Sequence, residues 1–158
     1  MGLKIPKVMI AAVKSGSGKT TVTCAFLKQL LCRKKHPVSF KCGPDYIDPM
    51  FHEQVLKIPS KNLDTFFSDV SQIQALYEME LPGHDIAVLE GVMGLYDGLG
   101  GIMEEGSSYH LAKTLDVPII LVVDARGMGK SVIPLIAGFL QYDEKKLKKL
   151  EKLSAEYR

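Results

Sequence analysis

The sequence predicts an α/β protein with a mostly parallel sheet flanked by helices, and two observations lead to this fold class. First, four short apolar runs alternate along the chain with segments of helical periodicity. Second, each Gly-rich or Asp-rich loop directly follows one of the apolar runs. Parallel strands joined by right-handed crossovers bring such loops to one edge of the sheet, which is where ligands bind in folds of this class.

The apolar runs predicted to form strands are residues 7–13, 38–42, 86–89 and 119–123. The first helix is predicted to begin at Lys19 and to end before Pro37, because proline cannot continue a helix. Weaker helical periodicity is present in residues 50–56, 70–79, 107–115 and 131–140. Residues 43–49 and 91–106 are predicted to be loops, and residues 62–64 a loop or a helix cap.

Length and composition suit one globular domain. The 158 residues carry 20 basic and 18 acidic side chains, a net charge of +2, and six of the basic side chains lie in residues 141–158. The rest of the chain is close to neutral, which argues against a nucleic-acid partner. The three cysteines have no spacing typical of a disulfide framework or a structural zinc site. Without a signal peptide or an apolar run of about 20 residues, we expect a cytoplasmic protein with no membrane partner.

The strongest local signal is a Gly/Ser-rich turn between the first predicted strand and the first helix. Successive backbone N–H groups in such a turn wrap an anion, and the helix N-terminus adds partial positive charge. Lys19 is placed to reach the β- and γ-phosphates of a nucleotide, and the Thr20 hydroxyl to bind Mg²⁺. The candidate nucleotide-binding residues are Ser15, Gly16, Ser17, Gly18, Lys19, Thr20 and Thr21.

Two neighbouring residues depart from the usual pattern of this turn. Val13 stands where the first glycine of the pattern is expected. Lys14 matches the signature lysine of deviant P-loop ATPases that partition chromosomes or position the division site. The sequence therefore leaves a second class of nucleotide-binding protein open.

A magnesium-dependent nucleotide site also needs an acid at the end of a strand. Glu90 and Asp124 both follow predicted strands, and Glu90 opens a Gly-rich loop that brings a second carboxylate, Asp97. A flexible surface loop is the simpler alternative for Glu90 and Asp97. Asp124 either caps the helix that follows it or faces the nucleotide, and both interpretations stay open.

A second acidic loop follows the second predicted strand. Lys41, Asp45 and Asp48 are expected to converge there, near the phosphates. Two carboxylates can hold Mg²⁺ or orient an amine nucleophile, and a lysine can neutralise charge on a phosphorylated intermediate. Gly, Pro and Asp are also the common residues of plain turns, so a simple turn is the alternative. His52 follows this loop closely enough to contact a substrate, but a histidine at the start of a helix is more often structural, so we expect a structural role.

Together these residues resemble a known family. The matching segments, residues 15–21, 40–52, 62–64, 90–98 and 121–127, are similar to the N-terminal ATP-dependent domain of the cobyrinic acid a,c-diamide synthases of cobalamin biosynthesis. Val13, Lys14 and Cys42 depart from the family pattern. The resemblance implies a P-loop NTPase fold like that of dethiobiotin synthetase over residues 1–142, followed by a Lys-rich tail at residues 143–158.

The resemblance also implies a chemistry. A ligase of this family uses ATP and Mg²⁺ to phosphorylate the a- and c-acetate carboxylates of cobyrinic acid or a related tetrapyrrole, and ammonia then displaces phosphate to leave an amide. Thr20, Glu90 and Asp45 are the implied magnesium ligands. The residues implied to handle the substrate or the phosphorylated intermediate are Lys41, Asp45, Tyr46, Asp48 and Asp97.

In the family, ammonia comes from glutamine in a C-terminal glutaminase domain, which we do not expect within these residues. Because only four strands are recognisable, we expect a truncated synthetase part, with a homodimer as one possible assembly. The alternatives are a partitioning-type ATPase that acts as a nucleotide switch, suggested by Lys14, and an inactive nucleotide-binding fragment. Within the first interpretation, cobyrinate, hydrogenobyrinate and nickel-sirohydrochlorin are not distinguished as substrates.

Overall fold

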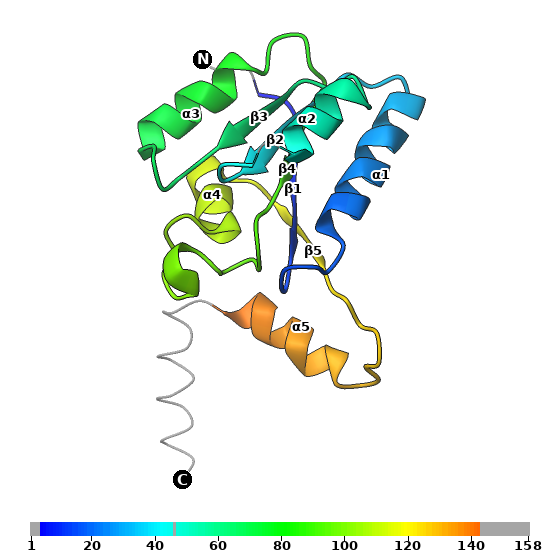
Figure 1. Cartoon of the computed structure of the whole chain (residues 1–158), viewed down its shortest axis with the longest axis vertical. Helices are drawn as coiled ribbons and strands as arrows, with labels where there is room; N and C mark the ends of the chain where they lie inside the picture. The colour runs from blue at the N-terminus through cyan, green and yellow to red at the C-terminus, as the bar shows by residue number, and fades with distance from the viewer. Residues whose placement is uncertain (1–3, 46, 143–158) are drawn as a thin grey trace. The chain divides into compact units, whose positions relative to one another are not determined.

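The computed structural model describes residues 4–45 and 47–142, and it confirms the predicted α/β fold with a parallel sheet (Figure 1). The sheet order is β3-β2-β4-β1-β5. The strands are β1 (Lys7–Ala12), β2 (Pro37–Cys42), β3 (Ser60–Leu63), β4 (Ile86–Glu90) and β5 (Ile119–Val122). The helices are α1 (Lys19–Cys32), α2 (Ile47–Gln54), α3 (Val70–Met79), α4 (Ser108–Leu115) and α5 (Val132–Gln141), and Leu99–Gly101 form a short 3-10 turn.

Strand β3 corrects the sequence prediction. Its four residues, Ser-Lys-Asn-Leu, pair in parallel with β2, from Ser39 opposite Ser60 to Cys42 opposite Leu63. The prediction of a loop or a helix cap at residues 62–64 is wrong for Asn62 and Leu63, and so is the count of four strands. The segment is too short and too polar to show an apolar alternation, and it forms a strand because it completes the hydrogen bonds at one edge of β2.

Helix α2 also begins earlier than predicted, at Ile47 rather than near Met50. The carboxylate of Asp45 accepts a hydrogen bond from the backbone N–H of Ile47 at 2.9 Å and one from that of Asp48 at 3.4 Å. Asp45 therefore satisfies donors of the first turn that have no acceptor inside the helix. Pro49 is tolerated because a helix needs no N–H from its first-turn residues.

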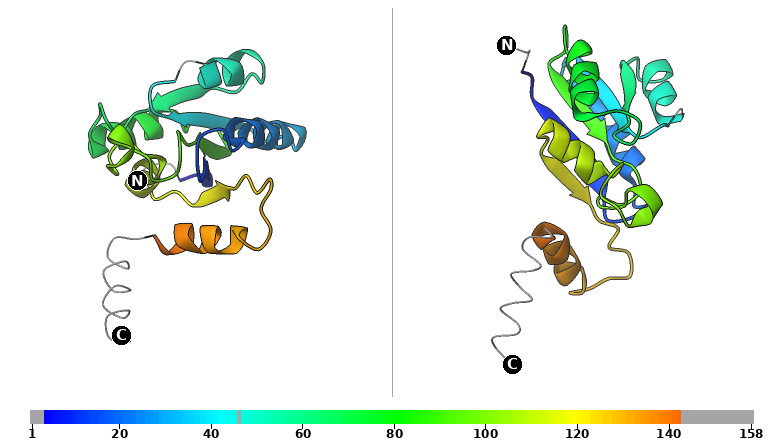
Figure 2. Two further views of the ribbon diagram at one scale, coloured as in Figure 1. Left: turned by 60° about the horizontal axis from the view of Figure 1, so that its bottom comes forward. Right: turned by 90° about the vertical axis from the view of Figure 1, so that its left-hand side faces the viewer.

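Helices α1 to α4 cover the two faces of the sheet in pairs (Figure 2). Helices α1 and α2 lie on one face, where Ile10, Leu27, Ile58 and Val88 form a core cluster that is at most 1% exposed. Helices α3 and α4 lie on the other face and contact each other, and Phe40 of β2 packs its ring 5.1 Å from that of Tyr77 on α3. Burying each large apolar side chain stabilises the fold by roughly 1.5–3 kcal/mol, so both faces contribute.

The register of β2 and β4 places two charged residues directly opposite each other. Lys41 is the partner of Glu90, at the carboxyl ends of both strands. Successive side chains of a strand alternate between faces, so Lys41 shares the α2 face with Ser39, and Glu90 shares the α1 face with Val88. The sheet itself therefore brings Lys41 and Glu90 together beneath the first turns of α1 and α2.

The described residues separate into two compact units that divide between Val122 and Val123. The sheet and helices α1 to α4 belong to the first unit, and α5 belongs to the second. In the part of the chain that the structure describes, none of the helices has the length and apolar character needed to cross a bilayer. The predicted Lys-rich tail lies outside the described residues.

Candidate functional site

The turn between β1 and α1 has the backbone conformation of an anion-binding loop. Gly16 and Gly18 have φ values of 74° and 92°, in the left-handed region that glycine adopts without strain. Gly18 is the N-cap of α1, so the first N–H groups of this helix have no intrahelical acceptor. The Oγ atom of Ser17 is buried and has no hydrogen-bond partner among the described residues. Free donors at a helix N-terminus are suited to bind phosphate oxygens.

Lys19 connects this turn to the loop after β4. Its side chain is buried, and Nζ donates a hydrogen bond to the carbonyl oxygen of Met93 at 2.5 Å. Burial, together with the nearby charge of Lys41, lowers the pKa of Lys19, while the charges of Glu90, Asp48 and Asp97 act in the opposite direction. The amino group of Lys19 therefore lies at the loop after β4 with a lowered pKa, and an anion bound beside it would favour its charged form.

Thr20 and Glu90 have the donor set of a magnesium site. The Thr20 hydroxyl donates a hydrogen bond to Glu90 Oε1 at 2.6 Å. Glu90 is fully buried, and its Oε2 atom has no hydrogen-bond partner among the described residues. A buried carboxylate oxygen without a partner is costly, and hydroxyl and carboxylate oxygens are ligands that Mg²⁺ prefers. The residues present therefore fit a magnesium ion.

The described residues contain no cluster of three or more acidic, histidine or cysteine side chains that would hold a metal ion by themselves. Mg²⁺ commonly binds one or two carboxylates, while substrate phosphates and water complete its coordination. An ion at Thr20 and Glu90 would accordingly depend on a bound nucleotide.

Lys41 is the centre of a buried ionic cluster. Its Nζ atom lies 2.9 Å from Glu90 Oε1, 2.5 Å from Asp48 Oδ2 and 3.7 Å from Asp45 Oδ2. Burial alone would lower the pKa of Lys41, but the charge of Glu90 and the hydrogen bonds to Asp48 and Glu90 outweigh it and raise that pKa. Likewise burial opposes the charge on Asp48, but the hydrogen bond from Lys41 lowers the pKa of Asp48. The cluster therefore holds Lys41 protonated and Asp48 ionised.

Asp45 has a second task besides the cap of α2. One of its oxygens accepts the backbone hydrogen bonds at the start of the helix, and the other faces Lys41. Its own carbonyl oxygen accepts a hydrogen bond from the Asn62 side chain at 2.7 Å. Asp45 is thus fixed between β2, β3 and α2, with part of its carboxylate open to solvent.

Asp97 stabilises the loop after β4. Its Oδ2 atom accepts a hydrogen bond from the backbone N–H of Gly94 at 3.0 Å. A side chain at Gly94 would collide with this carboxylate, because a Cβ would lie 2.4 Å from Asp97 Oδ2. A Cβ at Gly94 would also lie 2.8 Å from the Val13 carbonyl oxygen, so the backbone leaves no room for a side chain there, and the charge of Asp97 also acts on Lys19.

Three sequence candidates remain, Lys14, Tyr46 and Asp124, and the structure describes two of them. Tyr46 lies outside the described residues. Lys14 is exposed at the start of the anion-binding turn. Asp124 pairs with the guanidinium of Arg126 at 2.7 Å and accepts the Arg126 backbone N–H, whereas Ser131 is the N-cap of α5. Asp124 therefore does not cap the helix that follows it.

A pocket of about 410 Å³ joins the turn to the ionic cluster. Its volume is typical of small-molecule sites. Most of the lining follows from the sequence motifs, but the part contributed by the loop after β4 does not, because its residue types carry no signal beyond their glycines. The lining residues are Ser15, Gly16, Gly18, Lys19, Thr20, Thr21, Lys41, Asp45, Gly91, Val92 and Met93.

His52 of α2 contacts the strands beside the ionic cluster of Lys41. It is 1% exposed, and its Nδ1 atom lies 2.8 Å from Ser39 Oγ, which in turn lies 2.8 Å from Ser60 Oγ. Burial lowers the pKa of His52. The expectation of a structural histidine agrees with this geometry, because the ring links α2 to β2 and β3. Its two serine partners lie on polar positions of strands, and no motif indicates them in the sequence.

Comparison with known proteins identifies related chains. A family model described as the CobQ/CobB/MinD/ParA nucleotide binding domain matches residues 8–155. The chain is 46% identical over 136 residues to a cobyrinate a,c-diamide synthase of Gloeobacter violaceus. The matched residues are 86% of this chain and 30% of that protein.

Two further relatives carry the same name. The chain is 42% identical over 142 residues to the cobyrinate a,c-diamide synthase of Methanocaldococcus jannaschii, covering 90% of this chain and 32% of the relative. It is 41% identical over 141 residues to the cobyrinate a,c-diamide synthase of Limosilactobacillus reuteri, covering 88% of this chain and 31% of the relative. The chain thus spans about 30% of the length of the curated relatives it matches.

Proposed function

Because the chain belongs to the CobQ/CobB/MinD/ParA nucleotide-binding domain family, we propose that it is the ATP-dependent synthetase part of an amidoligase acting on cobyrinic acid. The names of the relatives supply the acceptor, a tetrapyrrole with acetate carboxylates. Hydrogenobyrinate and nickel-sirohydrochlorin present the same carboxylate chemistry and can replace cobyrinic acid in the assay below, so the amide formed from each acceptor distinguishes them.

The observation that carries this proposal is the buried ammonium of Lys41, held by Asp48 and Glu90 at the wall of the phosphate pocket. Phosphorylating a carboxylate brings two anions together, which requires fixed positive charge between them. Lys19 and Lys41 both line the pocket and supply ammonium groups there. Lys41 shares its charge with Asp48 and Glu90. A nucleotide switch that hydrolyses ATP with water has no second anion to neutralise.

ATP is proposed to bind with its phosphates in the turn at residues 15–21, where Lys19 and the first N–H groups of α1 contact the β- and γ-phosphates. Thr20, Glu90 and Asp45 would hold Mg²⁺, which supplies neutralisation of phosphate charge when it is bound. Glu90 Oε2 is the oxygen left for this task, since Oε1 already accepts hydrogen bonds from Thr20 and Lys41.

The first step joins the acceptor to phosphate. An acetate oxygen of the acceptor attacks the γ-phosphorus, the bond to the bridging oxygen breaks, and ADP leaves with the electron pair. Lys41 holds the attacking carboxylate and then the charged acyl phosphate. Tyr46 and Asp97 are proposed to contact the substrate or the intermediate, Asp97 by keeping the β4 loop closed beside Lys19.

The second step releases phosphate. Ammonia attacks the acyl carbon, the bond from that carbon to the phosphate oxygen breaks, and inorganic phosphate leaves. One proton must leave the nitrogen, and the Asp45 carboxylate, which is about one-third exposed, and Asp48 are the nearby bases that orient the amine and take this proton. We infer that the ammonia is released from glutamine by a glutaminase outside these residues.

The test follows oxygen from the acceptor. Purified chain is incubated with ATP, Mg²⁺, ammonium chloride and cobyrinic acid whose carboxylates carry ¹⁸O, and inorganic phosphate is analysed by mass spectrometry. One ¹⁸O atom should appear in phosphate for each amide formed, because the acyl phosphate transfers an acceptor oxygen. Lys41→Ala should lower this rate by about 10²–10³-fold, the usual effect of losing a group that stabilises developing charge. Lys61→Ala, which removes an exposed lysine from β3, is the matched control.

Three results would contradict the proposal. Amide formed without ¹⁸O in phosphate would exclude the acyl phosphate. Binding of ATP without turnover would leave only a nucleotide-binding fragment. ATP hydrolysis that ignores cobyrinic acid but responds to DNA or to anionic vesicles would instead support the nucleotide switch, which exposed Lys14 suggests.

A further inference from the structure

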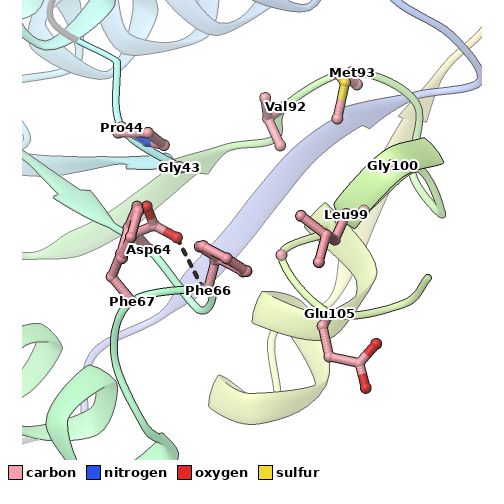
Figure 3. Close-up of a pocket in the computed structure, with 12 residues that line it drawn as sticks. Gly43, Pro44, Asp64, Phe66, Phe67, Val92, Met93, Leu99, Gly100 and Glu105 are labelled. Atoms are coloured by element: carbon pink, nitrogen blue, oxygen red, sulfur yellow. Dashed lines mark hydrogen bonds between the residues drawn. The ribbon is translucent and has the colours of Figure 1, made fainter. Parts of the chain in front are cut away.

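A second pocket, of about 280 Å³, lies next to the phosphate pocket over the carboxyl ends of β3, β2 and β4 (Figure 3). Three loops line it: Gly43 and Pro44 follow β2, Phe66 and Phe67 follow β3, and Leu99 belongs to the loop after β4. All of these residues lie in the first compact unit. The pocket is therefore formed at the same edge of the sheet as the ionic cluster.

The lining of this pocket is unusually apolar for a surface. Phe66, Phe67, Met93 and Leu99 are 51%, 76%, 42% and 46% exposed. Figure 3 shows Phe66 and Leu99 pointing toward each other from the loops after β3 and β4. Large side chains gathered at a pocket without burial commonly mark a ligand surface, since nothing in the fold requires their exposure.

The two pockets share a wall. Val92 and Met93 line both of them, and the loop after β2 contributes Pro44 to one and Asp45 to the other. The Met93 carbonyl also accepts the hydrogen bond from Lys19. A molecule in the apolar pocket is therefore separated from the phosphate-binding lysine by a single residue.

The two pockets differ in their charged residues, because both lysines line only one of them. The only charged residues that line the apolar pocket among the described residues are acidic, Asp64 and Glu105, and Asp64 also accepts the Phe66 backbone N–H at 2.9 Å. The phosphate pocket is lined by the two ammonium groups of Lys19 and Lys41 and by one acid, Asp45. A ligand with both carboxylates and hydrocarbon is thereby oriented, because its carboxylates are repelled from one pocket and attracted to the other.

We propose that the apolar pocket binds one hydrocarbon edge of the tetrapyrrole macrocycle and so directs an adjacent acetate carboxylate across Val92 and Met93 toward Lys41. The pocket, at about 280 Å³, is just below the usual range for ligand sites, so it takes an edge of the ring rather than the whole macrocycle. This inference rests on the proposed function, whose acceptor it positions.

Equilibrium dialysis with cobyrinic acid, measured by its visible absorbance, tests the pocket in the full chain. Leu99→Ala and Phe67→Ala should each raise the Kd for cobyrinic acid by roughly 10-fold, since each removes several apolar carbons from the contact. Leu76→Ala is the matched control, because Leu76 of α3 is also 46% exposed but lies outside the pocket. It should change the Kd less than about 2-fold, as expected of a surface substitution.

ATP affinity, measured by calorimetry, separates the possible failures. It should be unchanged in all three variants, which also shows that they are folded. If wild-type chain binds cobyrinic acid and both pocket variants bind it equally well, the pocket does not hold the macrocycle and the proposed function stands. If wild-type chain binds ATP but no cobyrinic acid, the acceptor in the proposed function is wrong, and this inference fails with it.

Discussion

Replacing Lys41 by methionine should destabilise the protein through the carboxylates it leaves behind. In the native cluster Lys41 contacts Glu90 Oε1 at 2.9 Å and Asp48 Oδ2 at 2.5 Å. Methionine fills a similar volume but carries no charge and donates no hydrogen bond. Among the described residues, the fully buried Glu90 then keeps only the hydrogen bond from the Thr20 hydroxyl.

The size of the effect follows from burial. Removing one partner of a buried ion pair costs about 3–5 kcal/mol, because the other charge stays in a medium of low dielectric. The Asp48 side chain is 16% exposed and regains some hydration, so we expect the lower end of this range, about 3 kcal/mol. For a domain of this size such a loss lowers Tm by roughly 10 °C.

Urea denaturation followed by circular dichroism measures the loss, with Lys61→Met as the exposed control, expected within about 0.5 kcal/mol of wild type. The double variant Lys41→Met/Glu90→Gln leaves no unpaired charge at position 90. Its loss of unfolding free energy should therefore be smaller than the sum of the two single losses by at least about 1.5 kcal/mol. Strict additivity, or a loss for Lys41→Met no larger than for the control, would refute this account of the cluster.

The same cluster predicts a pH dependence. Lys41 lowers the pKa of Asp48 in the folded protein, so this pair contributes stability above the unfolded pKa of about 3.9. That contribution is lost as the pH falls through the lower folded pKa. The difference between wild type and Lys41→Met should therefore shrink below about pH 4, and a difference that grows there would contradict the assignment.

Three further predictions concern separate residues. Lys19→Ala should weaken ATP binding about 10- to 100-fold by calorimetry, since a charge-assisted hydrogen bond contributes about 1.5–3 kcal/mol; unchanged affinity would remove Lys19 from the phosphate site. Asp97→Asn keeps an oxygen for the Gly94 N–H, so ATP affinity should persist while amide formed per ATP consumed falls; equal loss of ATP affinity in the Lys19 and Asp97 variants would show that Asp97 is wrongly assigned. Burial lowers the pKa of His52, so the free energy of unfolding should fall as the pH decreases below the unfolded pKa of about 6.5. His52→Asn should therefore make the urea midpoint change less between pH 7 and pH 5. An equal change in wild type and variant would show that His52 does not titrate on unfolding.

The secondary structure could be predicted where local chemistry decides it. Helix α3 has the predicted bounds, Val70–Met79, because Asp69 and Gln72 form a capping box at its start. Strands β1, β2 and β4 follow from apolar runs, since strands buried on both faces need no polar alternation. Strand β5 follows from the same kind of run, although it lies at the edge of the sheet and its Ile120 is 46% exposed. Strand β3 was not predictable in this way, because its polar residues become a strand only by pairing with β2.

The candidate site divides in the same manner. The turn at residues 15–21 is recognisable because its function depends on the local backbone, which glycine, lysine and threonine specify in order. The second pocket had no comparable signal. Phe66, Phe67 and Leu99 are ordinary apolar residues in the sequence, and only the meeting of three loops shows that they share an exposed surface.

The sequence by itself determined the fold class, the anion-binding turn, the family and the set of charged residues at the strand ends. The tertiary structure decided how these residues combine: Lys41 faces Glu90 because β2 and β4 pair in that register, and Asp48 joins them because Asp45 starts α2 early. Local motifs can be recognised in the sequence because they act through backbone groups that are neighbours along the chain. Contacts across 49 residues, such as that from Lys41 to Glu90, depend instead on strand register, which the sheet as a whole selects.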